Sequence, residues 1–103
     1  MRFSERLYVG KKAEQKRDRI LQGLREGALQ PQVYVLIPAK NGNNLLDIYP
    51  CAMLKLPGFP DADPLVVGVA VTYWEALEVA RQIVDELYRE TGGFCLKDLL
   101  GEG

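Results

Sequence analysis

Histidine is absent from the 103 residues of this chain. Its absence excludes a Ser-His-Asp or Cys-His triad, and it removes both the commonest metal ligand and the usual switch of charge near neutral pH. An enzyme built on this chain would depend on carboxylates, Lys, Tyr, Cys or a bound cofactor. Because the sequence carries no motif for such chemistry, we predict no catalytic residues, no cofactor and no metal site, and we lean against an enzyme.

Cysteine is scarce, and long apolar runs are missing. Cys51 and Cys95 are too few for a disulfide framework and lack metal-ligand spacing, so we expect two reduced thiols. No stretch approaches the ~18 apolar residues that span a bilayer, and the first residues lack the apolar core of a signal peptide. These features predict a cytoplasmic protein that does not enter a membrane.

The net charge of -1 conceals an uneven distribution. Residues 1–26 carry eight Lys or Arg against four Asp or Glu, whereas residues 27–103 carry five against ten. We expect the two halves to complement each other within the fold or across a dimer. The segment from Lys11 to Arg25 could instead contact phosphates, but acidic residues interrupt it and it contains no aromatic residue, so the pattern favours a solvated helix face over nucleic-acid binding.

The length suits one globular domain over residues 1–103, with 48% of the residues hydrophobic. A chain of this size buries roughly two-thirds of the surface that its unfolded form exposes, which leaves a modest stability. Burial of more surface between copies would add to that stability. We therefore predict a homo-oligomer, most simply a dimer.

The first third of the chain predicts one strand and one helix. Residues 4–9 form the strand, and Gly10 ends it. Residues 11–28 form an amphipathic helix, because their apolar residues recur at helical spacing despite Gly23. Gly27 and the turn residues after it end the helix.

The middle of the chain predicts a hairpin. Residues 33–37 are β-branched and aromatic, and they are apolar on both faces, which is typical of an interior strand. Residues 40–44 favour a turn, and residues 45–49 then return as a second strand. Asn44 with Asp47 could instead cap a helix.

The last part predicts a strand and a long helix. Residues 50–55 form a short helical segment that begins at a proline, and residues 57–64 form a loop, since three prolines and a glycine defeat regular structure. Residues 65–71 are the most apolar run and predict a buried central strand. Thr72-Tyr73-Trp74-Glu75 has the form of a capping box, and it starts a helix that continues to about Thr91.

These elements follow in the order (β)-α-β-β-β-α and define an α+β fold. We expect an α/β two-layer sandwich with a three- or four-stranded, mostly antiparallel sheet. Each main helix has one apolar stripe to bury, so both helices are predicted to cover one face of the sheet.

The junction between the central strand and the last helix, from Gly68 to Glu75, is the most natural place for a ligand. Amides at the start of a helix attract anions, and Tyr73 and Trp74 could stack on a planar ring. Against a phosphate, Gly68 stands alone without a phosphate-binding glycine pattern, and the carboxylate of Glu75 would repel it. The alternative is that Gly68 allows close packing and that Thr72 caps the helix.

Three further positions carry reactive groups. Asp47 lies within an apolar run and could face a cleft, although a solvent-facing carboxylate is the simpler interpretation. Cys51 is the one candidate nucleophile, because it follows a proline that could start a helix; inert packing is the simpler interpretation. Asp61 and Asp63 could hold a hard cation or exchange protons, but solvated loop charges would have the same pattern.

Several segments together resemble a family of small proteins from Gram-positive bacteria, over most of residues 5 to 100. The segments are Asn44-Leu45-Leu46-Asp47-Ile48-Tyr49, Val66-Val67-Gly68-Val69-Ala70, Tyr73, Glu75-Ala76-Leu77, and Tyr88 with Thr91-Gly92-Gly93-Phe94. The family has no assigned activity or site. The resemblance therefore implies a bacterial, cytoplasmic protein and transfers no functional residue.

Taken together, the sequence favours a non-enzymatic binding or oligomerisation module. The alternative is a small-molecule sensor that binds an anionic or aromatic ligand near Thr72, with Gly68, Tyr73, Trp74, Asp47 and Cys51 as candidate ligand-binding residues. An enzyme that works without histidine is the third hypothesis.

Overall fold

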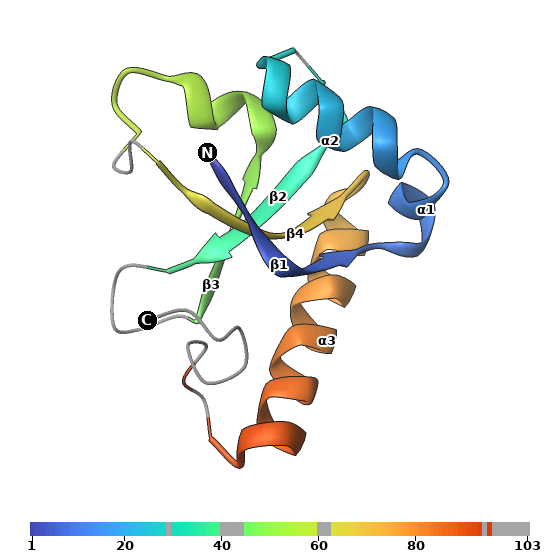
Figure 1. The fold of residues 1–103 in the computed structure, drawn as a ribbon, viewed down its shortest axis with the longest axis vertical. Helices are drawn as coiled ribbons and strands as arrows, with labels where there is room; N and C mark the ends of the chain where they lie inside the picture. Colours follow the sequence, from blue (N-terminus) through green and yellow to red (C-terminus); the bar gives the residue numbers. More distant parts are fainter. Residues whose placement is uncertain (29, 40–44, 60–62, 94, 96–103) are drawn as a thin grey trace.

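A computed structural model describes residues 1–28, 30–39, 45–59, 63–93 and 95 (Figure 1). Strands, helices and one 3-10 helix (η1) follow in the predicted order: β1 (Arg2–Val9), α1 (Lys11–Glu14), α2 (Arg17–Glu26), β2 (Tyr34–Pro38), β3 (Leu46–Pro50), η1 (Cys51–Lys55), β4 (Leu65–Ala70) and α3 (Tyr73–Thr91). The predicted α+β class, with a mostly antiparallel sheet and two main helices, is confirmed.

The sheet has the strand order β1-β4-β2-β3. β4 and β2 are interior, as their apolar runs predicted, and they pair antiparallel. β1 joins parallel to β4, and β3 joins antiparallel to β2. The hairpin of β2 and β3 is therefore confirmed, and the alternative of a helix that continues through Asp47 is wrong, because Leu46–Pro50 is a strand. The predicted turn at residues 40–44 lies outside the described residues.

The two main helices pack on opposite faces of the sheet. Successive side chains of a strand point to opposite faces, and in β2 the neighbours Val35 and Leu36 belong to different core clusters. The Leu36 cluster contains α3 residues such as Ile83, whereas the Val35 cluster contains α2 residues such as Leu24. The expected placement of both helices on one face is therefore wrong, and helices cover both sides of the sheet.

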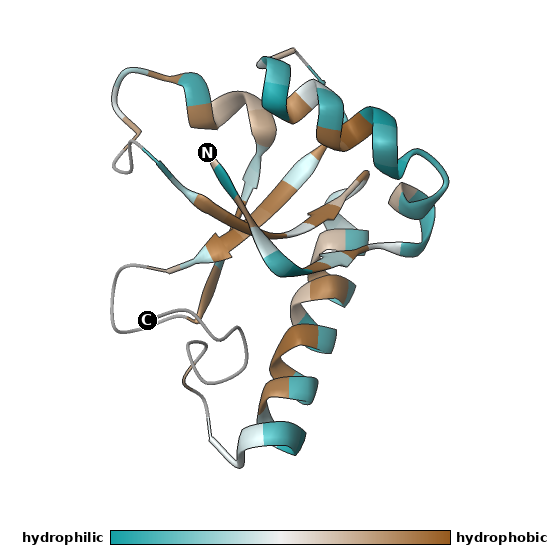
Figure 2. Ribbon diagram, viewed as in Figure 1, coloured by the Kyte–Doolittle hydropathy of each residue, from teal (hydrophilic) through white to brown (hydrophobic). Residues whose placement is uncertain are grey.

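Both faces need this cover because the central strands are apolar throughout. Figure 2 shows the middle of the sheet coloured as hydrophobic, with the long helix α3 hydrophobic on one side and hydrophilic on the other. The largest fully buried side chains include Leu36, Val35, Val66 and Val67 from β2 and β4, and Ile83 and Leu87 from α3.

The predicted helix over residues 11–28 is interrupted. α1 ends at Glu14, the backbone turns at Lys16, and α2 runs on to Gly27, whose φ of 74° ends the helix in the left-handed conformation that glycine tolerates. The amide of Lys12 donates to the carboxylate of Glu75, and this contact ties the start of α1 to the start of α3. In the described part of the chain, no helix is long and apolar enough to cross a membrane.

Candidate functional site

The predicted strand-to-helix junction is a capped helix start. Thr72 has an extended backbone, and its hydroxyl accepts a hydrogen bond from the amide of Glu75 at 3.0 Å. This is the N-cap contact that the Thr-x-x-Glu pattern predicted. One of the amide donors at the start of α3 is therefore already satisfied by the chain itself.

The carboxylate of Glu75 bridges two segments at this junction. One of its oxygens accepts from the amide of Val71 at 2.9 Å, and the other accepts from the amide of Lys12 at 2.5 Å. A Cβ atom at Gly10 would lie 2.4 Å from the Cγ and Cδ atoms of Glu75, so the absent side chain makes room for this carboxylate. The junction thus holds an anionic group of its own where an external anion was considered.

Gly68 lies away from the helix start, inside the sheet. It is buried, and a Cβ atom there would lie 3.0 Å from Cγ1 of Val79 and 3.2 Å from Cδ1 of Leu36. The contact with Val79 brings α3 close to β4. The position therefore has the close packing that was the alternative to a ligand contact.

Tyr73 and Trp74 stand beside the junction and belong to a row of three aromatic rings. Tyr34 of β2 lies edge-on to Tyr73 with ring centroids 6.0 Å apart, and Tyr73 lies edge-on to Trp74 at 6.3 Å. Trp74 is 77% exposed and Tyr73 is 49% exposed. The row therefore leaves aromatic ring surface of Tyr73 and Trp74 open to solvent.

Asp47 and Cys51 form hydrogen bonds with residues outside the strand-to-helix junction. The hydroxyl of Tyr49 donates to Asp47 over 3.4 Å, and the thiol of Cys51 donates to the carbonyl of Gln30 at 3.2 Å. Burial raises the pKa of the Cys51 thiol, although Gln30 and Lys55 oppose the shift. A protonated, buried thiol is a poor nucleophile. The burial of Cys51 and its hydrogen bond to Gln30 therefore favour inert packing over a reactive thiol.

Both cysteines are free, with Cys51 buried and Cys95 exposed.

Of the predicted carboxylate pair on the loop, Asp61 lies outside the described residues. Asp63 is exposed and lies 3.0 Å from the guanidinium of Arg2. A hydrogen bond from the amino group of Met1 lowers the pKa of Asp63. Among the described residues, no three His, Cys, Asp or Glu side chains come together as metal ligands would.

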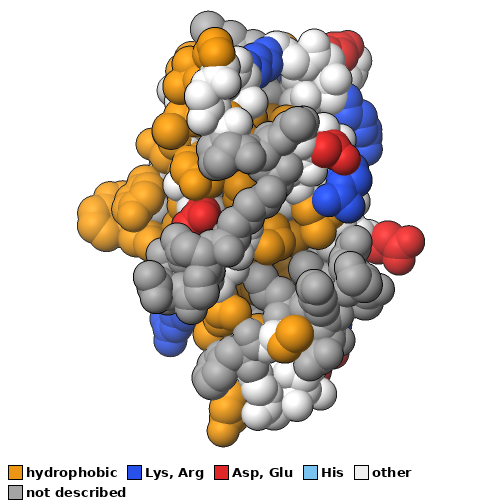
Figure 3. Space-filling model, turned by 90° about the vertical axis from the view of Figure 1, so that its left-hand side faces the viewer, with side chains coloured by type: hydrophobic (Ala, Val, Ile, Leu, Met, Phe, Trp, Pro, Cys, Tyr) orange, Lys and Arg blue, Asp and Glu red, His pale blue; other side chains and the backbone are white. Residues whose placement is uncertain are grey.

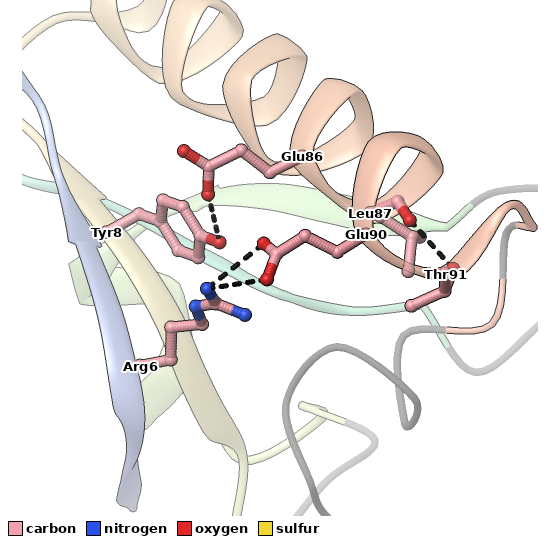
Figure 4. Close-up of polar contacts among 6 residues, drawn as sticks. All are labelled: Arg6, Tyr8, Glu86, Leu87, Glu90 and Thr91. Carbon is pink, nitrogen blue, oxygen red and sulfur yellow. Dashed lines mark hydrogen bonds and ion pairs between the residues drawn. The ribbon is translucent and has the colours of Figure 1, made fainter.

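A polar cluster joins β1 to α3 (Figure 4). The hydroxyl of Tyr8 donates to Glu86 at 2.6 Å, and the guanidinium of Arg6 pairs with Glu90 at 3.0 Å. Burial, followed by the hydrogen bond to Glu86, raises the pKa of Tyr8 well above its usual value, so the phenol stays protonated as a donor. Sequence reasoning missed this cluster, which links the basic start of the chain to its acidic end.

The basic segment contributes an exposed, mixed surface. A shallow hollow of about 390 Å³ lies where α1 gives way to α2, and its lining is one continuous stretch, residues 14–19. Glu14 and Arg17 in that lining approach to 3.6 Å. Because Glu14 and Asp18 lie among the basic residues of this lining, the hollow is a poor phosphate site.

The flank of α3 that faces away from Arg6 and Tyr8 is apolar. Tyr73, Leu77, Ala80, Val84 and Tyr88 recur there at helical spacing, next to the buried stripe of Ala76, Val79, Ile83 and Leu87. We call these five residues the α3 flank. Tyr73, Leu77 and Tyr88 are exposed by 49%, 38% and 55%, and neighbouring Trp74 by 77%.

The α3 flank lies on the face of the sheet to which the edge strand β3 also contributes. α3 packs mainly on β4, β2 and β1, while Leu46 and Ile48 of β3 and Tyr34 of β2 remain partly exposed beside its core cluster. Figure 3 shows apolar side chains over much of the described surface on the left of the view, while most charged side chains lie towards the right and an acidic side chain lies among the apolar ones.

No family model, curated protein or solved structure matches this chain. The resemblance to a Gram-positive bacterial family therefore stays a prediction.

Proposed function

We propose that this protein is a non-enzymatic interaction module that forms a homodimer through the α3 flank, Trp74 and the neighbouring edge of the sheet. One observation carries the proposal: four large apolar side chains, Tyr73, Trp74, Leu77 and Tyr88, are exposed on a single helix. Tyr and Trp are the residues that contribute most often to binding energy at protein interfaces. Contiguous apolar surface of this kind marks interaction sites in small proteins.

The charges around the flank are consistent with this proposal. Glu86 and Glu90 engage Tyr8 and Arg6 on the β1 side of α3, so the carboxylates lie away from the flank. The five residues of the flank are uncharged, and the exposed Arg81 lies beside them, one turn from Leu77. An interface core that lacks charge avoids the cost of desolvating unpaired ions.

Replacing Leu77 with Glu tests the proposed interface. A carboxylate in the middle of the flank loses its hydration on association, so we expect the dimer dissociation constant to rise about tenfold or more. Sedimentation velocity over a range of protein concentrations measures this constant. The matched control is Gln82→Glu, which adds the same charge at an exposed position on the opposite side of α3 and should leave the constant within about twofold.

Two results would count against the proposal. A wild-type chain that sediments as a monomer at every concentration has no such interface. Equal effects of Leu77→Glu and Gln82→Glu would mean that general charge, and not the α3 flank, controls association.

The aromatic row favours a second candidate, a sensor for a planar aromatic ligand. Tyr34, Tyr73 and Trp74 form successive edge contacts with the outer ring largely exposed. An anionic ligand has less support, because Glu75 already accepts hydrogen bonds from two amides there. The cytoplasmic location predicted from the sequence remains part of the proposal, and free thiols suit such a reducing compartment.

A further inference from the structure

β3 is an edge strand, and no other described strand pairs with its outer side. The amide of Cys51 donates to Val33, and the amide of Ala39 donates to Leu45, so these residue pairs are hydrogen-bonded pairs of the β2–β3 ladder. Since hydrogen-bonded pairs alternate along an antiparallel ladder, Asp47 and Tyr49 also bond towards β2. The main-chain groups of Leu46, Ile48 and Pro50 therefore point away from β2, towards an edge that no other described strand covers.

The opposite edge of the sheet is protected in a way that β3 is not. β1 carries Arg2, Glu5 and Arg6, and two of these engage carboxylates, Arg2 with Asp63 and Arg6 with Glu90. Charged side chains on an edge strand discourage pairing with another chain. β3 has a single charged residue, Asp47, and its one proline stands at the end of the strand.

Resting on the proposed function, the geometry points to a specific dimer: two copies of β3 pair antiparallel about a two-fold axis at Ile48 and join two sheets into one. In this register Ile48 lies opposite Ile48 of the second copy, and Leu46 lies opposite Pro50 of the second copy. The ladder then forms about four main-chain hydrogen bonds, because every outward amide finds a carbonyl. Pro50 lacks an amide, so it adds only an acceptor.

Charge and the number of main-chain hydrogen bonds favour the register with its axis at Ile48 over the two neighbouring registers. A two-fold axis at Asp47 would set two carboxylates directly opposite each other, which destabilises a strand pair. An axis at Tyr49 would leave only Ile48 and Pro50 to bond across the interface. The axis at Ile48 sets Asp47 opposite Tyr49 of the second copy, a phenol that already donates to Asp47 within one chain.

The same register extends the apolar surface. Leu46 and Ile48 pack beside the core cluster of α3, so their side chains lie on the face that carries the α3 flank. Pairing at Ile48 brings these side chains of both copies together on that face. The α3 flanks of the two copies then lie on the same face of the joined sheet, one on each side of the paired β3 strands.

Amide hydrogen exchange followed by NMR tests the register on the intact protein. We expect the amides of Leu46 and Ile48 to become at least about tenfold more protected as the protein concentration rises through the dissociation constant. The amides of Asp47 and Tyr49, which bond towards β2, serve as the internal control and should change less. A dimer in which Leu46 and Ile48 exchange equally fast at all concentrations would overturn the register and leave the proposed function standing; a chain that stays monomeric would overturn both.

A charge exchange at the axis gives a second measurement. Ile48→Glu and Ile48→Lys each set like charges opposite each other, so each variant alone should dimerise at least about tenfold more weakly, while a mixture should recover a heterodimer. The control is the same pair of changes at Leu46. Leu46 lies opposite Pro50 of the second copy, so mixing Leu46→Glu with Leu46→Lys brings no opposite charges together and should not strengthen dimerisation. Recovery at Leu46 equal to that at Ile48 would contradict an axis at Ile48.

Discussion

Replacing Gly68 with Val is expected to lower the free energy of unfolding by about 3 kcal/mol, at the upper end of the cost of overpacking a core. The first added carbon alone would lie 3.0 Å from Val79 and 3.2 Å from Leu36, and both neighbours are buried between β2, β4 and α3. Two further methyl groups have no space unless α3 moves off the sheet. Urea denaturation, monitored by the fluorescence of Trp74, measures the change.

The matched control for this prediction is Gly58→Val. A Cβ atom at Gly58 has no atom within 4 Å, and the residue is exposed. We expect that variant to stay within about 0.5 kcal/mol of the wild type. If Gly68→Val is equally harmless, Gly68 is not a packing position, and its role in a ligand site regains support.

Replacing Glu75 with Ala is expected to lower the free energy of unfolding by about 2 kcal/mol. The change leaves the amides of Val71 and Lys12 without their carboxylate acceptor, removes a negative charge from the start of α3, and opens a space beside Gly10. The loss should reach the first helix as well, because Lys12 lies at the start of α1. Thermal unfolding gives the stability, and amide exchange at Lys12 gives the local effect.

Two controls make this result specific. Glu78→Ala removes a carboxylate from an exposed position one turn further along α3 and should cost less than about 0.5 kcal/mol. Glu75→Gln keeps one carbonyl acceptor, so its free energy of unfolding should lie between that of the wild type and that of Glu75→Ala. A Glu75→Ala protein as stable as wild type, with unchanged exchange at Lys12, would show that the bridge contributes nothing to the fold.

Local patterns predicted most elements because the relevant forces act locally. The β-branched runs in residues 33–37 and 65–71 identified the interior strands, and the Thr72 to Glu75 pattern identified the cap of α3. The interruption between α1 and α2 could not be predicted in this way. No glycine or proline marks the break at Gln15 and Lys16, and the contact that holds the start of α1 comes from Glu75, 63 residues from Lys12 in the sequence.

The layer arrangement was misjudged although a signal was present. Residues 33–37 are apolar on both faces of the strand, and a sheet with two apolar faces needs cover on both sides. The single apolar stripe of each helix indicates that the helix packs against the sheet, but it does not indicate which face of the sheet the helix covers. In the structure, α3 covers one face of the sheet and α2 covers the other.

The structural surroundings of the candidate site residues differ. Thr72 caps the helix, and Tyr73 and Trp74 are exposed next to it. Gly68 packs against α3 and β2 instead, and Asp47 and Cys51 contact Tyr49 and Gln30. The α3 flank was missed because the sequence analysis gave each main helix a single apolar stripe, all of it to be buried against the sheet. Its signal was in the sequence: Tyr73, Leu77, Ala80, Val84 and Tyr88 widen the apolar face beyond what one helix buries against a sheet.

Native mass spectrometry of the gently purified protein tests the central claim most directly, because one spectrum gives the oligomeric state and any retained ligand. The account predicts a dimer with the mass of two bare chains, which dissociates into monomers on dilution. A monomer that carries additional mass, and loses it on activation, would contradict the dimer and support the sensor for a small ligand instead.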